Sequence, residues 1–123
     1  MKRKMNWVLA VAVGLLGMSM PLSAHHGTAA FETEKTIDLK GTVVEWSWSN
    51  PHCLLQFDVK GDDGQVVRWV AETQNPVTQA NAGWSKTSFK PGDPVTVTVL
   101  PSKNGKPLGR IKQVLLADGK ILH

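Results

Sequence analysis

The strictest constraint on the fold comes from the segment His52–Lys60, in which apolar and polar side chains alternate. A period of two is that of a β-strand, whose successive side chains point to opposite faces. The apolar set is Cys53, Leu55, Phe57 and Val59, and the other set is His52, Leu54, Gln56 and Asp58. The segment therefore predicts a half-buried strand with Cys53 in the core and His52 pointing away from it.

Further segments rich in β-branched and aromatic residues predict four more strands, separated by turns rich in Gly, Pro and Asp. The five predicted strands are 39–48, 52–60, 65–72, 94–100 and 110–117. A single short helix is predicted between the third and fourth strands, capped by Asn75, opened by Pro76 and ended by Gly83. This order predicts an all-β chain, with small α+β content at most, folded as a five-stranded OB-like Greek-key barrel. Another small β-sandwich or roll is the alternative.

The N-terminal segment has the order of a secretory signal peptide. Three basic residues at 2–4 precede the uncharged stretch Trp7–Met20, and Pro21 and Ala24 suit a cleavage site after residue 24. The apolar stretch is short for a membrane span, which needs about 20 residues, although an uncleaved anchor stays open. We therefore expect a signal peptide at 1–24, an N-terminal arm at 25–38 and the barrel at 39–123. The mature protein is expected in the periplasm or secreted, without a stable membrane anchor.

Charge and cysteine content exclude several classes of function. The 123-residue chain has a formal charge of +4, and three of its basic residues lie in the predicted signal peptide. The mature chain is therefore close to neutral, which argues against nucleic acid as a partner because polyanion binding needs a concentrated basic face. The single cysteine excludes an intramolecular disulfide framework and a Cys-rich zinc site.

Histidine provides the main candidates for a metal site. Cleavage after residue 24 would leave His25 at the N-terminus, where the α-amine and the imidazole together chelate Cu(II). His52 is the expected third nitrogen ligand, so the set resembles the histidine brace of copper monooxygenases and some copper carriers. His26 is an alternative ligand, and Glu72 is a candidate oxygen ligand or hydrogen-bond partner. Alternatively, these histidines have no metal role and His52 only orders a turn.

Tryptophan provides a second candidate surface. The mature chain contains four tryptophans and no tyrosine, and Trp46 and Trp48 share one face of the first predicted strand while Trp69 lies on the third. Aromatic side chains on a barrel face stack on bases or sugars. The alternative is that tryptophans, Trp84 among them, fill a small core.

Several motifs in a fixed order also make residues 25–119 similar to a known family. They are His25-His26-Gly27 with Phe31, Gly41-Thr42-Val43, Trp48-Ser49-Asn50-Pro51-His52, Trp69 with Glu72, Asn75-Pro76, Gly83-Trp84, Lys90-Pro91-Gly92-Asp93 and Asp118-Gly119. The chain resembles a family of small secreted bacterial proteins that contain a domain of unknown function. That family usually has Ser at Gly27, an aliphatic residue at Cys53 and often Arg at Ala82. The resemblance implies that the histidine motifs and the Trp-x-x-Glu motif share a site. It does not bring a known activity with it.

The sequence therefore favours an exported small binding protein that holds one copper ion through His25, His52, His26 and Glu72. An interaction module is the first alternative, with a protein partner in the periplasm, a glycan or a small apolar ligand bound on the tryptophan face. A copper-dependent oxidase is the second. Common catalytic motifs are absent, so enzymatic activity is left open and binding without turnover is favoured.

Overall fold

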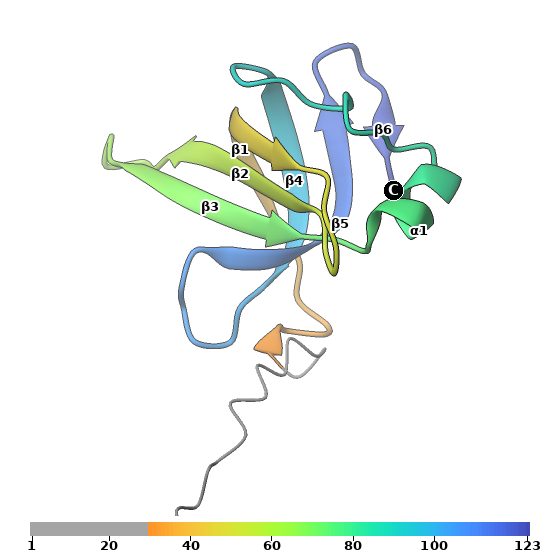
Figure 1. Cartoon of the computed structure of the whole chain (residues 1–123). Coiled ribbons are helices and arrows are strands. Elements are labelled where there is room, and N and C mark those ends of the chain that lie inside the picture. The colour runs from red at the N-terminus through yellow and green to blue at the C-terminus, as the bar shows by residue number, and fades with distance from the viewer. Residues whose placement is uncertain (1–29) are drawn as a thin grey trace, which may run out of the picture.

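The computed structural model describes residues 30–123, which form a closed five-stranded β-barrel with one short helix (Figure 1). The elements are β1 (Ile37–Ser47), β2 (Leu54–Lys60), β3 (Val66–Glu72), α1 (Pro76–Asn81), β4 (Pro94–Pro101), β5 (Leu108–Leu116) and β6 (Ile121–Leu122). Neighbouring strands follow the order β3-β2-β1-β4-β5, and a parallel pairing of β3 with β5 closes the barrel. The predicted OB-like barrel, with a helix between the third and fourth strands, is confirmed.

Several strand boundaries differ from the sequence-based expectation by one or two residues, and one strand is additional. β1 begins at Ile37, two residues earlier than expected, because Ile37 and Asp38 already pair with Val99 and Thr98 of β4. β2 begins at Leu54 rather than at His52, and β5 begins at Leu108, two residues earlier than expected. Residues beyond the fifth predicted strand make the two-residue strand β6, which pairs with Val114 and Leu115 of β5. The pairing of β6 with β5 depends on the chain reversal between these two strands, which residue preferences for β structure do not specify.

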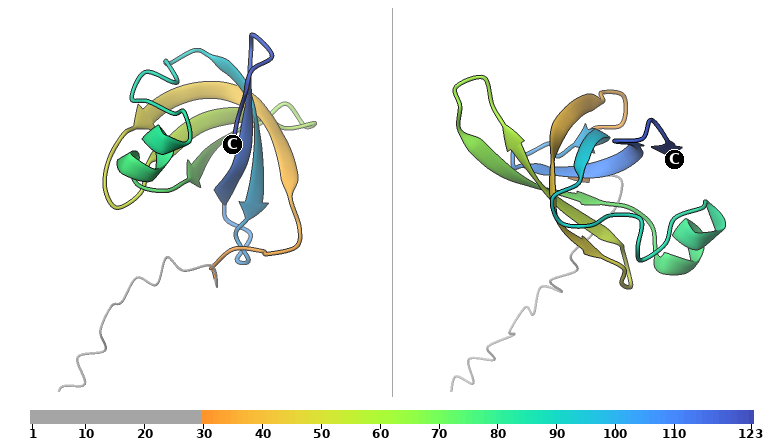
Figure 2. Two further views of the ribbon diagram at one scale, coloured as in Figure 1. Left: turned by 90° about the vertical axis from the view of Figure 1, so that its right-hand side faces the viewer. Right: turned by 90° about the horizontal axis from the view of Figure 1, so that it is seen from above.

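The helix begins and ends where its capping residues predict. The Asn75 side-chain oxygen accepts a hydrogen bond from the Thr78 backbone N at 3.0 Å, and Pro76 needs no donor at the first helical position. Gly83 has φ +92°, the left-handed conformation that glycine adopts without steric cost. Figure 2 shows α1 on the opposite side of the barrel from the β2–β3 turn.

The barrel interior is filled by the alternating apolar positions of its strands. Cys53, Leu55 and Phe57 are fully buried, as the alternation along 52–60 predicts, and Leu55 and Phe57 share one core cluster with the fully buried Val97 and Val99 of β4. The side chains between them on each strand face outward. That outer face of β2 and β3 carries the residues considered next.

Candidate functional site

A cavity of about 360 Å³ lies where the β1–β2 connection, β2, β3, the start of β5 and the N-terminal arm meet. Its lining residues are Phe31, Ser49, Asn50, Pro51, His52, Leu54, Val70, Glu72, Leu108 and Gly109. The walls are mostly apolar, with a few polar side chains among them. Cavities of this size and character are the usual form of a small-molecule site.

The imidazole of His52 is held in a defined orientation beside this cavity. Its Nδ1 lies 3.0 Å from the backbone carbonyl oxygen of Thr73. Because a carbonyl can only accept, Nδ1 carries the proton of the neutral ring and donates it, which leaves the lone pair on Nε2. The Thr73 backbone N in turn donates to the carbonyl of Cys53, so the strand pairing itself fixes the partner of the ring. His52 therefore offers one free acceptor or metal-ligating nitrogen.

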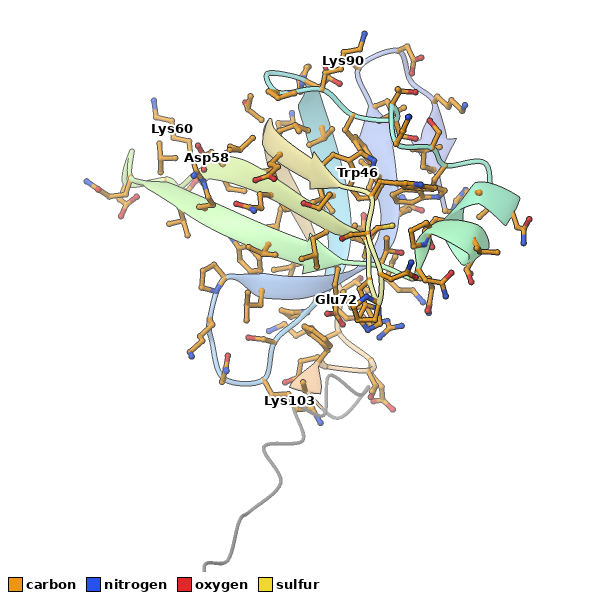
Figure 3. All side chains as sticks on the ribbon, in the orientation of Figure 1. Trp46, Asp58, Lys60, Glu72, Lys90 and Lys103 are labelled. Carbon is orange, nitrogen blue, oxygen red and sulfur yellow. The ribbon has the colours of Figure 1, made fainter. Side chains whose placement is uncertain are left out.

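Glu72 ends β3 and is the buried charged group of the cavity (Figure 3). The residue is only 9% exposed, and its Oε1 is buried without a hydrogen-bond partner among residues 30–123. The Arg110 Nη1 lies 3.7 Å from that oxygen, because Glu72 and Arg110 are paired in register across the parallel β3–β5 ladder. At this distance the guanidinium balances the charge of the carboxylate but does not hydrogen-bond to Oε1.

His52 and Glu72 both line this cavity. Leu54 is paired with Glu72 at the end of the β2–β3 ladder, and backbone hydrogen bonds join the preceding Cys53 to Thr73 and Gln74, so His52 lies at the end of the ladder where Glu72 is. Two of the four predicted metal ligands are therefore brought to one cavity.

The N-terminal arm enters the same cavity through Phe31, which is 6% exposed. A bridge pairs Phe31 with Ser102, and backbone hydrogen bonds join Glu32 to Pro101 at 2.9 Å and Lys103 to Ala30 at 3.1 Å. The arm is thus attached to the β4–β5 loop. His25 and His26, which the sequence nominates as metal ligands, lie outside the described residues.

The three tryptophans of the predicted ligand face lie outside this cavity. Trp46, Trp48 and Trp69 are each half-buried and pack against the core. Trp46 has its ring centroid 5.8 Å from that of Trp84 and 5.0 Å from that of Phe89, and its Nε1 donates to the Ser85 carbonyl at 2.9 Å. None of the three lines the cavity described above. The expectation that tryptophan fills the core is met by Trp84, which is 2% exposed.

Cys53 is fully buried, and its thiol does not line the cavity. Burial raises the pKa of the Cys53 thiol, while a backbone hydrogen bond from Ser49 acts in the opposite direction. A thiol that stays protonated and covered is a poor nucleophile. Cys53 therefore behaves as the small apolar core residue that its place in the alternation predicts.

The model of a family of unknown function, DUF6152, matches residues 12–111 of the chain. The chain belongs to this family. No curated protein matches the chain. All residues that line the cavity of this DUF6152 protein fall within the matched range, whereas β6 lies beyond it.

The part of this DUF6152 chain that the structure describes contains no helix long and apolar enough to cross a membrane. Within residues 30–123 there is also no group of three or more His, Cys, Asp or Glu side chains placed to hold a metal ion. His52 and Glu72 are thus not joined by a third such side chain within residues 30–123.

Sequence reasoning missed Phe31, Leu108 and Arg110 as site residues of this DUF6152 protein. Leu108 and Arg110 reach β3 only through the parallel β3–β5 pairing, which joins segments almost forty residues apart. The one available signal was the alternation along β5, which places Arg110 and Leu108 on the same face. The residue preference for β structure alone could not select their partner strand.

Proposed function

We propose that this protein is an exported binding protein that holds a small, largely apolar molecule in the cavity between His52, Glu72 and Phe31. The observation that carries the proposal is the cavity itself, in which apolar walls surround a buried carboxylate and an oriented imidazole. Apolar walls supply affinity, and a few placed polar groups supply orientation and specificity. The role is carriage or sensing without turnover.

The position of the cavity in the fold supports a binding role. It lies on the outer face of β2 and β3, between the β1–β2 connection and the start of β5 after the β4–β5 loop. OB-type barrels bind their ligands on this face and with these two loops. The support is by analogy of topology, since a fold by itself does not specify a ligand.

Export is proposed from the N-terminal sequence. The basic start, the fourteen-residue uncharged stretch and the small residue at 24 together favour removal of residues 1–24 and a periplasmic or secreted protein. An intact mass of the protein recovered from the periplasm tests this, and an uncleaved mass of the full chain would contradict it.

The binding proposal is tested with 2-methoxynaphthalene as an apolar probe, titrated into the isotope-labelled protein while backbone amide NMR signals are followed. The expected shifts cluster at the cavity residues of β3 and β5. A Leu108→Lys substitution places a charge on the cavity wall and should weaken binding at least about tenfold, because desolvating a charge opposes an apolar ligand.

Leu115→Lys is the matched control for this experiment. Leu115 lies on the same strand and is 38% exposed against 37% for Leu108, but it does not line the cavity. It should bind the probe as the wild type does. Equal binding by both variants, or signal shifts confined to another face, would reject the cavity as the binding site.

A copper ion is the second candidate ligand, favoured by the orientation of His52. Its Nδ1 donates to the Thr73 carbonyl, the arrangement that leaves Nε2 of a metal-binding histidine free and correctly aimed. Phe31 lies at the cavity six residues after His25, and six residues span up to about 20 Å. The proposed ligands are the His25 amine and ring with His52, and Glu72 and His26 are auxiliary.

Copper binding is tested by calorimetric titration of Cu(II) into protein that begins at His25. The His52→Ala variant should lose at least tenfold in affinity, whereas His123→Ala, a substitution at an exposed histidine, should not. A chain with two extra N-terminal residues blocks the His25 amine and should bind less tightly. Equal affinity across all four proteins would exclude this site.

A further inference from the structure

Among the described residues, Glu72 has a buried side-chain oxygen, Oε1, that accepts no hydrogen bond. Glu72 Oε1 is the one buried side-chain nitrogen or oxygen atom of residues 30–123 that lacks a hydrogen-bond partner. A buried acceptor that makes no hydrogen bond carries its full desolvation cost. Because Glu72 also lines the cavity, a ligand there lies beside the carboxylate group that lacks this hydrogen bond.

The charge of Glu72 is already balanced within the protein. Arg110 lies 3.7 Å from Oε1, and both side chains are largely buried, with 21% and 11% of their surfaces exposed. A cationic ligand would add a second positive charge beside Arg110 in a region of low dielectric constant. An anionic ligand would face the carboxylate. Both charges are costly to bury without a partner.

The imidazole of His52 adds a second acceptor to the same cavity. Since Nδ1 donates to the Thr73 carbonyl, the neutral ring keeps only an acceptor on Nε2. Glu72 and His52 therefore each offer an acceptor to a hydrogen-bond donor on the ligand, and neither favours a ligand with a net charge. The remaining walls, which include Phe31, Leu54 and Leu108, are apolar.

We propose that the cavity selects neutral, largely apolar molecules that carry an O–H or N–H group, such as phenols, alcohols and secondary amides, and that the Glu72 carboxylate accepts that hydrogen bond. This inference rests on the proposed function, because it names the chemical class of the ligand of the same cavity. Carboxylates, and amines that are protonated at neutral pH, are excluded as ligands.

The test compares four probes that share one apolar body and differ in the attached group. They are 2-naphthol, 2-methoxynaphthalene, 2-naphthoate and protonated 2-naphthylmethylamine, each titrated at neutral pH by calorimetry and located by backbone amide shifts. The naphthol should bind at least about tenfold more tightly than its methyl ether, because a hydrogen bond to a buried charged acceptor exceeds a typical neutral one. The anion and the cation should bind more weakly than the naphthol.

The Glu72→Gln variant tests whether Glu72 is the source of the preference for naphthol over its methyl ether. It should reduce the ratio of naphthol to ether affinity to within about threefold, since a neutral amide is a weaker acceptor than a carboxylate. Glu45→Gln is the matched control, because Glu45 is exposed on β1 and does not line the cavity. If the Glu72 variant does not fold, the ratio of naphthol to ether affinity measured on the wild type still tests the inference.

The outcomes separate the inference from the proposed function. Binding of all four probes at the cavity with equal affinity would overturn the inference and leave the cavity as an apolar site. Tighter binding of the cation than of the naphthol would also overturn it, since Arg110 would then not balance Glu72. Failure of every probe to shift the cavity signals would overturn both proposals.

Discussion

The aromatic cluster beside α1 and the cavity at the end of β3 differ in how completely their polar groups are hydrogen-bonded. In the aromatic cluster, formed by Trp46, Trp48, Trp84 and Phe89, neighbouring rings lie 5.0–6.0 Å apart. The indole N–H groups of Trp46 and Trp84 donate to the carbonyls of Ser85 and His123 at 2.9 and 2.8 Å. The cavity instead contains an unpartnered carboxylate oxygen.

This difference shows where a small barrel keeps its capacity to bind. The aromatic cluster holds the more conspicuous residues, but its rings pack on one another, and the N–H groups of Trp46 and Trp84 already have partners within the protein. The cavity holds less conspicuous residues, but two of its acceptor atoms, on Glu72 and His52, have no hydrogen-bond partner among the described residues. Aromatic content therefore indicates packing here, and an unsatisfied buried acceptor indicates the candidate binding site.

The largest effect is expected from truncating the aromatic cluster. Trp84→Ala should lower the free energy of unfolding by about 3–5 kcal/mol, because Trp84 is almost fully buried among other rings. Chemical denaturation measures the loss, and Trp84→Phe should lose less because it retains a packed ring. Probe binding at the cavity should be unchanged in the folded variant. A loss of binding would show that the two regions are coupled and would break the comparison.

The next largest effect is expected from the ion pair behind the cavity. Arg110→Ala should cost about 2–4 kcal/mol in unfolding free energy, because it leaves the buried Glu72 carboxylate without a counter-charge. The double variant Glu72→Leu with Arg110→Met should recover most of this stability and lose the preference for naphthol over its ether. If the double variant kept that preference, Glu72 would not be the acceptor.

A smaller effect is expected at Gly109, which lines the cavity. A Cβ at this position would lie 2.7 Å from the Val99 Cβ, so Gly109→Ala should cost about 1–3 kcal/mol through overpacking, measured by denaturation. Gly61→Ala is the control, because the nearest atom there belongs to the exposed side chain of Asp63. Equal losses in the two variants would mean that β5 does not approach β4 as closely as described.

The smallest effect is expected on the exposed β2–β3 ladder, outside both regions. The Arg68 side-chain hydrogen bonds hold the pKa of Asp58 below its ordinary value, so this pair stabilises the folded state above the unfolded pKa of about 3.9. The stability difference between wild type and Asp58→Asn should therefore shrink as the pH falls through the folded pKa of Asp58. Denaturation at several pH values measures this, and a difference that grows on acidification would contradict it.

The sequence alone determined the order of strands and helix and their burial pattern. The alternation along 52–60 placed Cys53, Leu55 and Phe57 in the core, and the Asn75-Pro76 pair located the start of α1. These features could be predicted because they depend on local backbone preferences and on a period of two within one segment. The same local information set most strand boundaries within two residues.

Only the tertiary structure decided which residues share the cavity. His52 and Glu72 were both nominated from the sequence, but their shared place at the cavity depends on the register of β2 with β3. Phe31 joined them through its bridge to Ser102 in the β4–β5 loop, and the pairing of β5 with β3 brought Arg110 beside Glu72; no local signal specifies either contact. Strand register and barrel closure follow from the burial of many distant side chains at once, so the sequence indicated the elements and the packed barrel selected their neighbours.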